Sequence, residues 1–327
     1  MGFLENKLQG IKTAVILGHI HPDGDCVGSC LGLYNYIKDQ FPDVNITVYL
    51  EPPAEKFRYM RYFDTIQSEM PENLVQTDLC ICLDSGDRER LGPFLPLLEG
   101  AKDSLVVDHH ITNTRYGAEN IVAEKASSTC EVLYNELFDP DQIGRETAEC
   151  LYTGIVHDTG VFQHSNTSAK TMEIAGKLME KGIAFSDIIT QSFYKKTYVQ
   201  NQIMGRALLE SVTFLHGRCI FSVVRKKDMD FYGVDSNDMD GIVDQLRITE
   251  GVECAIFMYE TNSQEFKVSM RSNHVVDVSK IAAYFGGGGH IRAAGCTMSG
   301  RIHDVVNNLS LHIAKQLEEK DKECTTE

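Results

Sequence analysis

The chain has 327 residues, 43% of them hydrophobic, which is enough apolar material for two globular domains. Its formal net charge of -16 disfavours duplex DNA and other long polyphosphate partners, but it leaves room for a short nucleotide in a local cationic pocket. The first residues lack the basic and apolar regions of a secretion signal, and no apolar run reaches the ~18 residues of a membrane span. We therefore expect a cytoplasmic chain that makes no use of a membrane, with its scattered cysteines reduced.

The first half of the sequence alternates between apolar, β-branched segments and segments of helical periodicity. Strands are predicted over 13–20, 45–51, 78–85 and 104–110, and helices over 25–41, 127–138, 144–160 and 168–182. Near-continuous apolar strands separated by helices indicate a mostly parallel sheet covered on both faces. Cys80 and Cys82 fall in the third strand, and we interpret them as core residues because no second Cys/His pair with zinc-site spacing lies nearby.

The pattern changes near residue 186, where a long helical stretch begins. Strand-like segments separated by polar turns follow at 217–226, 251–260 and 265–273, and the polar end, 318–327, is expected to fray. The sequence therefore predicts a two-domain α/β protein. Its parts are a parallel-sheet domain over 1–185, a helical connector over 186–210 and a smaller α/β domain over 211–327.

Metal-binding residue types follow the apolar strands of the first half, or lie where a helix gives way to a loop. They are His19, Asp23, Asp25, Asp84, His109, His110 and Asp158. In a parallel sheet, ligands bind in the crevice outside the carboxyl ends of the strands, so these loops are expected to converge there. Each stretch alone is common in turns and caps, but four of them in one parallel-sheet domain favour a shared site.

Four carboxylates in one cleft would repel one another, and their pKa values would rise unless cations balanced them. Two divalent cations would neutralise the four aspartates, with His19 and His109 as neutral ligands. Mixed carboxylate and imidazole ligands suit Mn²⁺, Fe²⁺ or Mg²⁺, and the absence of thiolate argues against structural zinc. Two ions ~3.5–4 Å apart would activate a water for in-line displacement at phosphorus. Asp84, which lies between the other ligand groups along the chain, is the predicted bridge between the two ions.

Six stretches of this chain carry a resemblance to a known family. GHIHPDGDCVGS, LDSGD, VVDHH and GIVHDTG look like the four motifs of the DHH phosphoesterase family, in order and at typical separations. VSMRSN and FGGGGHIRAAG resemble the substrate-binding DHHA1 domain. The match spans nearly the whole chain, and two-domain chains of this length most resemble the branch that acts on nanoRNA and on 3′-phosphoadenosine 5′-phosphate (pAp).

The resemblance implies a ligand set that agrees with the one reached from charge and placement. One Mn²⁺ would be held by His19, Asp23 and Asp84. The second would be held by Asp25, Asp84, His109 and Asp158.

The resemblance also implies roles for residues that do not bind the metal ions. His110 would lie beside the scissile phosphate, where we expect it to stabilise the transition state or protonate the leaving oxygen. Asp108 would orient a neighbouring histidine. His21 stands where many relatives have Asn or another polar residue, and a supporting or substrate contact is expected of it rather than a ligand role.

Substrate-binding residues are predicted mainly in the second domain. Glycines let backbone N–H groups approach a phosphate or base, and arginine offers a planar fork for bidentate contact with phosphate. The predicted substrate residues are Gly288, Gly289, His290, Arg271 and, in the first domain, Arg115. Arg292 is a further candidate; for both Arg115 and Arg292 the plain alternative is an exposed surface arginine. The alternative for the glycine run is a flexible linker, which its position between KIAAYF and IRAAG disfavours.

The sequence thus predicts a phosphoesterase with two Mn²⁺ ions, or with Mg²⁺ or Fe²⁺ in their place. It would hydrolyse short oligoribonucleotides to mononucleotides, pAp to AMP, or both, by attack of a two-metal-activated hydroxide, with Asp84 and His110 as catalytic residues. One alternative is a phosphodiesterase for linear or cyclic dinucleotides such as pApA and cyclic di-AMP. Another is a non-enzymatic nucleotide sensor, which is disfavoured because no predicted ligand is missing. The resemblance further suggests a homodimer.

Overall fold

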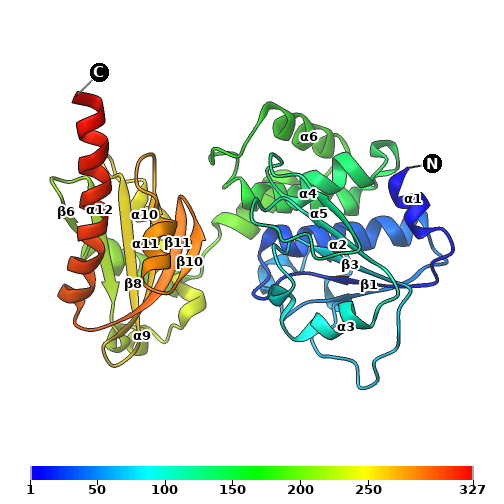
Figure 1. Ribbon diagram of the computed structural model, residues 1–327, viewed down its shortest axis with the longest axis horizontal. Helices are drawn as coiled ribbons and strands as arrows, with labels where there is room; N and C mark the ends of the chain where they lie inside the picture. The colour runs from blue at the N-terminus through cyan, green and yellow to red at the C-terminus, as the bar shows by residue number, and fades with distance from the viewer. Residues whose placement is uncertain (1, 326–327) are drawn as a thin grey trace. The chain divides into compact units, whose positions relative to one another are not determined.

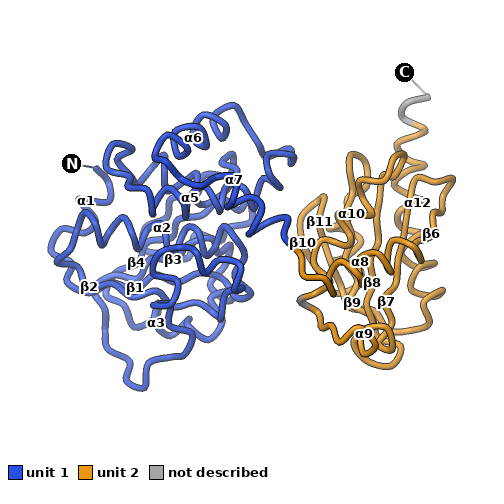
Figure 2. The backbone as a smooth tube through the Cα atoms, turned by 180° about the vertical axis from the view of Figure 1, so that it is seen from behind, with its two compact units in different colours: residues 1–195 blue, residues 196–327 orange. Residues whose placement is uncertain are grey.

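The computed structural model describes residues 2–325 and divides into two compact units, unit 1 (Met1–Lys195) and unit 2 (Lys196–Glu327) (Figures 1 and 2). Each unit has its own sheet and its own hydrophobic core. The predicted two-domain α/β organisation is confirmed. Within the described residues, no helix combines the length and the apolar content that crossing a bilayer requires.

Unit 1 is built on a parallel sheet of five strands in the order β2-β1-β3-β4-β5. The strands are β1 (Thr13–Leu17), β2 (Asn45–Tyr49), β3 (Leu79–Leu83), β4 (Ser104–Asp108) and β5 (Glu119–Val122). The four predicted strands are present, and each ends two or three residues early because its last predicted residues already belong to a loop. The prediction from the sequence missed β5, a strand of four half-buried residues in which only Ile121 and Val122 are apolar, too short a run to mark a strand.

Helices cover both faces of this sheet (Figure 1). They are α1 (Phe3–Leu8), α2 (Gly24–Gln40), α3 (Leu95–Gly100), α4 (Thr129–Val132), α5 (Arg145–Asp158), α6 (Ala169–Glu180) and α7 (Phe185–Ile188). π-Helical turns at Leu133–Leu137 and Ile189–Tyr194 extend α4 and α7. Side chains of β3 alternate between the two faces: Leu79, Ile81 and Leu83 pack toward α2 and α5, whereas Cys80 and Cys82 pack toward α3. The two cysteines are thus core residues, as predicted.

Helices α2 and α5 pack directly against each other, and each has a glycine at the contact. A Cβ on Gly28 would lie 2.6 Å from the carbonyl oxygen of Cys150. A Cβ on Gly154 would lie 2.3 Å from the Cys130 sulfur and 2.5 Å from a carboxylate oxygen of Asp25. The close approach therefore places the Asp25 carboxylate between the two helices and the start of α4.

This contact leads to a stability prediction with a built-in control. Gly154→Ala would force atoms apart in a packed core, and we expect it to destabilise unit 1 by about 1–3 kcal/mol. Gly176 lies in α6, where an added Cβ would meet nothing within 4 Å, so Gly176→Ala should stabilise by about 0.5–1 kcal/mol through helix propensity. Urea titrations of the full chain, followed by circular dichroism, measure both shifts. An unchanged midpoint for Gly154→Ala would contradict this account of the packing.

The segment predicted as a connector, 186–210, is helical in two pieces. The π-helical turn after α7 ends at Tyr194 in unit 1, and α8 (Tyr198–Leu209) belongs to unit 2. Thr197 caps α8 by accepting a hydrogen bond from the backbone N–H of Gln200. Ile203 and Ala207 of α8 are buried in a core of unit 2.

Unit 2 contains a mixed sheet of six strands in the order β10-β11-β9-β8-β7-β6, in which only β7 and β8 pair in parallel. The strands are β6 (Val212–Phe214), β7 (Cys219–Val224), β8 (Cys254–Asn262), β9 (Glu265–Ser272), β10 (Gly288–His290) and β11 (Ala293–Ser299). The helices are α8, α9 (Lys226–Tyr232), α10 (Ile242–Arg247), α11 (Val278–Tyr284) and α12 (Ile302–Thr325). Short 3₁₀ turns in the two units lie at Glu55–Phe57, Phe63–Thr65, Glu89–Phe94, Pro140–Gln142 and Ser236–Met239.

The polar end of the chain differs from the expectation. Residues 318–325 do not fray but continue α12, which is drawn in red in Figure 1; the last two residues lie outside the described part. The reason is upstream, where Leu309, Ile313 and Leu317 bury one face of the helix against the sheet. Once that face is fixed, adding further helical turns costs little.

Candidate metal centre

The predicted metal-binding residues converge at the carboxyl edge of the unit 1 sheet. Strand β1 has β2 on one side and β3 on the other, so the chain reverses its direction of travel across the sheet at β1. Loops that follow the strands on either side of such a switch point leave a crevice between them. The end of β4, the loops after β1, β3 and β4, and the first turn of α2 carry the residues to this edge, namely His19, Asp23, Asp25, Asp84, Asp108, His109 and His110.

His19 is buried and held in one orientation. Its Nδ1 lies 2.7 Å from the carbonyl oxygen of Ile20, which can only accept, so Nδ1 carries the proton. The other ring nitrogen, Nε2, lies 3.7 Å from a carboxylate oxygen of Asp23 and 3.5 Å from one of Asp84. Asp23 also caps α2, because its Oδ1 accepts from the backbone N–H groups of Asp25 and Cys26.

Asp84 lies between His19 on one side and His109 and His110 on the other. One carboxylate oxygen faces His19, and the other lies 3.7 Å from His109 Nε2 and 3.7 Å from His110 Nδ1. The hydroxyl of Thr129 donates to that second oxygen at 3.1 Å. Asp84 has a backbone φ of 55°, a left-handed conformation that aspartate tolerates better than most residues. The turn after β3 therefore places the buried Asp84 carboxylate between the imidazoles at the carboxyl edge of the sheet.

Asp25, His109 and Asp158 form the other half of the cluster. Asp25 is fully buried, and its carboxylate accepts hydrogen bonds from the backbone N–H groups of Thr129 and Cys130. His109 Nε2 lies 3.0 Å from a carboxylate oxygen of Asp158, the last residue of α5. The start of α4 thus anchors Asp25, and the end of α5 brings Asp158 to the sheet edge.

Asp108 orients His110 rather than His109. Its Oδ1 lies 2.7 Å from His110 Nδ1 and also accepts from the backbone N–H of His109, while Oδ2 accepts from the Asn113 amide at 2.6 Å. Burial acts to lower the pKa of His110, but the hydrogen bond to Asp108 and the charges of Asp84 and Asp108 together outweigh it and raise the pKa. Both carboxylate oxygens are therefore committed, and the imidazole is held with Nδ1 protonated.

The protein alone does not balance the charge at this site. Burial and the charge of Asp158 raise the pKa of Asp25 to about 7. Burial and the charge of Asp25 raise the pKa of Asp84 to about 6, and burial raises that of Asp158 to about 6 despite its hydrogen bond with His109. Burial acts to lower the pKa of His109, but Asp158 and the other carboxylates raise it to about 10. Carboxylates crowded together in this way call for additional positive charge.

The donor atoms fit divalent cations. Among the described residues, three groups lie close enough to hold an ion: His19 with Cys26 and Asp84; Asp25 with His109 and Asp158; and Asp84 with Asp108, His109 and His110. The ion-pair separations of 3.0–3.7 Å quoted above suit neighbouring ligands of one ion, for which bonds are about 2.0–2.2 Å long. Burial raises the pKa of the Cys26 thiol well above its usual value, which leaves the donors as oxygen and imidazole nitrogen.

Sequence reasoning missed two supporting residues. Thr129 donates its hydroxyl to Asp84 and its backbone N–H to Asp25. Glu131 is buried and accepts from Ser127 and Thr171, which fixes the loop before α4. The stretch SSTCE could have indicated this role, because the first N–H groups of a helix have no partner within the helix and can bind a carboxylate. The His21 side chain is 89% exposed and lies 3.3 Å from a carboxylate oxygen of Glu51, so it is not part of the carboxylate and imidazole cluster.

The glycine run lies in unit 2 as an edge strand. Gly288, Gly289 and His290 form β10, which pairs with β11 and is exposed. Gly289 has φ of 142°, and a Cβ there would lie 2.5 Å from the carbonyl oxygen of Ala293, so this glycine is needed for the strand pairing. Nothing lies within 4 Å of a Cβ on Gly288, so that position is open to a ligand.

The three arginines proposed as substrate contacts have different surroundings. Arg271 is the second-last residue of β9, pairs with Ala293 of β11, is partly exposed, and donates from Nε to Asp244 at 3.1 Å. Arg115 is exposed in unit 1, where its backbone N–H donates to Asn113. Arg292 donates to backbone carbonyl oxygens of His274 and Val276, so it braces a loop.

Comparisons with known proteins agree with this architecture. Residues 13–155 match the DHH family, N-terminal domain, and residues 217–319 match the DHHA1 domain. A bifunctional oligoribonuclease and PAP phosphatase NrnA from Thermus thermophilus is 30% identical over 92% of this chain and 89% of its own length. A cyclic-di-AMP phosphodiesterase PdeA from Listeria monocytogenes is 27% identical over 89% of this chain and 45% of its own length.

One solved structure shares the fold across nearly the whole chain. It is an exopolyphosphatase-related protein from Bacteroides fragilis, 24% identical in sequence, with a TM-score of 0.87 over 95% of this chain and 94% of that one. Two family models match, and a relative is 30% identical along almost the full length of the chain. The cluster of carboxylates and imidazoles at the sheet edge agrees with both. The chain therefore belongs to the DHH family and is a phosphoric ester hydrolase.

Proposed function

We propose that this chain is a Mn²⁺-dependent phosphoesterase that releases mononucleotides from short oligoribonucleotides and converts pAp to AMP. The observation that carries this proposal is the buried Asp84 carboxylate, which faces His19 on one side and His109 and His110 on the other. Carboxylate and imidazole donors suit Mn²⁺. The Thermus thermophilus relative, named for both activities, supports the choice of substrates.

The residues have distinct roles in this proposal. His19, Asp23, Asp25, Asp84, His109 and Asp158 would hold two divalent cations, which supply an activated water and positive charge for in-line displacement at phosphorus. Asp84 would contribute to both ions. Asp108 holds the His110 imidazole through Nδ1, so that this side chain is oriented to stabilise charge or to give a proton to the leaving oxygen. Thr129 fixes both Asp25 and Asp84 and so keeps the ligands in place.

Unit 2 would bind the nucleotide. Gly288 leaves an exposed strand edge open, and Arg271 provides a guanidinium whose Nε is held by Asp244. We expect Arg271→Gln to raise KM for a short RNA by about tenfold, as for a lost charge-assisted hydrogen bond, with little change in kcat. Steady-state kinetics with Mn²⁺ test this. The matched control is Arg218→Gln, since Arg218 is a unit 2 arginine paired with Asp321. A fall in kcat with KM unchanged would contradict a binding role.

A turnover panel with Mn²⁺ tests the proposed function. We expect AMP from pAp and mononucleotides from two- to five-nucleotide RNA, with no release of phosphate from pyrophosphate. The Listeria relative favours a second candidate, a cyclic or linear dinucleotide phosphodiesterase, so cyclic di-AMP and pApA belong in the panel. Turnover of cyclic di-AMP that exceeds that of every linear substrate would replace our proposal with that candidate.

A further inference from the structure

A groove on unit 2 lies away from the residues proposed for the substrate. It has a volume of about 940 Å³ and forms where β7 ends, where β8 turns into β9, and where α12 begins. Helix α9, whose first turn also lines the groove, marks this end of unit 2 in Figure 1. Arg271 pairs with Ala255 and Ala293 at the opposite end of the strands. Arg271 lies six positions after Glu265 along β9, a distance of roughly 20 Å in an extended strand.

The floor of the groove is apolar. Phe221 and Val223 project from β7, Phe266 comes from β9, and Ile302 begins α12. Phe266 is buried, whereas Phe221, Val223 and Ile302 keep part of their surface accessible. The volume is in the range of ligand pockets, about 300–1,000 Å³, and an aromatic floor of this kind suits a flat ring.

The charge that the groove offers to a ligand is positive, although the chain as a whole is acidic. Arg225, Lys227 and Arg301 line it, are exposed, and form no ion pair or side-chain hydrogen bond within residues 2–325. Helix α12 also begins there, and its amino end adds partial positive charge.

The acidic residues of the groove, in contrast, already have partners within unit 2. Glu210 lies 2.7 Å and Asp228 lies 3.7 Å from the guanidinium of Arg206. Glu260 accepts hydrogen bonds from the backbone N–H groups of Lys226 and Gln264. The four basic side chains Arg206, Arg225, Lys227 and Arg301 thus exceed the three carboxylates by one, and the three cations without an acidic partner among the described residues are available to an anion.

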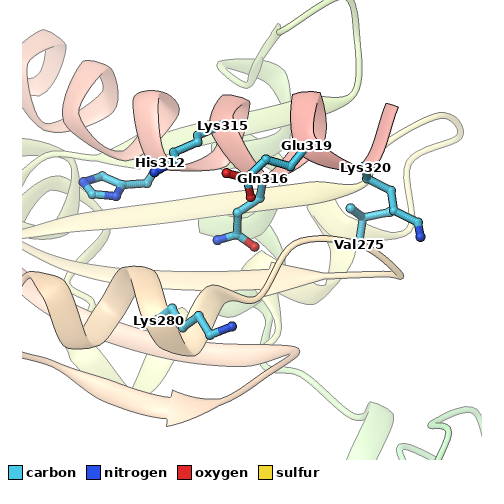
Figure 3. Close-up of a pocket in the computed structure, with 7 residues that line it drawn as sticks. All are labelled: Val275, Lys280, His312, Lys315, Gln316, Glu319 and Lys320. Atoms are coloured by element: carbon cyan, nitrogen blue, oxygen red, sulfur yellow. The ribbon is translucent and has the colours of Figure 1, made fainter. Parts of the chain in front are cut away.

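A second pocket on unit 2 lacks this arrangement. It has a volume of about 380 Å³ and is lined by Lys280, Lys315 and Lys320 (Figure 3). Glu319 lines it as well, and Lys280 lies 3.3 Å from the carboxylate of Asp277. Acidic groups thus stand among the lysines, and no aromatic residue lines this pocket except the ring of His312.

We propose that the larger groove binds a mononucleotide, with its base on the apolar floor and its phosphate on Arg225, Lys227 and Arg301. An inorganic anion alone would leave the floor uncovered, and an uncharged nucleoside would leave the three cations unused. None of the residues that line the groove is a proposed metal ligand or substrate residue, so we expect a nucleotide held there to regulate the enzyme and not to be cleaved.

The test is a titration of the ¹⁵N-labelled full chain with AMP in the presence of a chelator, followed by NMR. We expect the amide signals of Val223 and Gly300 to shift saturably. AMP should bind at least about tenfold more tightly than adenosine or inorganic phosphate, because only AMP uses both the floor and the cations. The double variant Arg225→Gln/Arg301→Gln should weaken this response about tenfold, and Arg218→Gln should leave it unchanged.

Three results would overturn the proposal: shifts confined to Gly288–His290, an equal response to phosphate alone, or an unchanged response in the double variant. Repeating the titration with Asp84→Asn separates this proposal from the proposed reaction. Groove binding should persist in that variant whatever happens to hydrolysis, because Asp84 belongs to unit 1.

Discussion

Asp84→Asn is expected to lower kcat for short RNA by at least about 10³-fold, which corresponds to roughly 4 kcal/mol of transition-state stabilisation. Asp84 faces three imidazoles at 3.5–3.7 Å, so its loss removes a donor from both halves of the cluster. Asparagine is the right replacement because it keeps the side-chain shape and tolerates the left-handed backbone at this position. Kinetics with Mn²⁺ and pAp or pApA measure the loss, and far-UV circular dichroism checks the fold.

The matched control is Asp103→Asn. Asp103 immediately precedes β4, at the amino edge of the same sheet, and pairs with Lys7 at 2.8 Å. The variant makes the same chemical change in the same unit but away from the cluster, so we expect activity within about twofold of the parent, as for loss of a partly exposed ion pair. If Asp84→Asn retained parental turnover in a clean preparation, the two-metal proposal would have to be abandoned.

Mn²⁺ is expected to raise the melting temperature of the chelator-treated protein by roughly 5 °C or more. An ion that binds only the folded state at a hundred times its Kd stabilises by about 2.7 kcal/mol, and the crowded carboxylates of Asp25, Asp84 and Asp158 provide the reason for binding. Differential scanning calorimetry measures the shift, and excess chelator should reverse it.

This calorimetric experiment does not depend on any substrate. Asp84→Asn should lose most of the Mn²⁺-induced shift, whereas Asp103→Asn should keep it. An equal shift in both variants would mean that Mn²⁺ stabilises the protein from somewhere other than the predicted cluster.

The parallel sheet and the candidate ligands could be predicted because both rest on local signals. Apolar runs mark β1, β3 and β4, and a charged or imidazole side chain follows each of them. Parallel strands then bring these residues together without any knowledge of side-chain packing. Asp158 could be predicted in the same way, since it was expected where a helix gives way to a loop, and α5 ends at that residue, two positions before the predicted helix end at 160.

The remaining features depend on contacts between distant segments. Strand β5 is a half-buried edge that forms only because β4 is beside it. Strand β10 lies in a glycine run that has no strand pattern. Only its pairing with β11 shows that Gly289 is needed for close strand contact. Thr129 lies 45 residues from Asp84 in sequence, so nothing local connects its hydroxyl to that carboxylate. The excess of basic side chains in the groove could not be predicted from the sequence, because it depends on which groups pair with each carboxylate.

Because all six candidate ligands come from unit 1, and unit 2 has a separate core, the two halves of the molecule are free to diverge at different rates. Substitutions that reshape the surfaces of β10, β11 or α12 leave the ligands at the carboxyl edge of β1, β3 and β4 where they are. Such a division would let one hydrolytic centre be retained across a lineage while its nucleotide preference drifts.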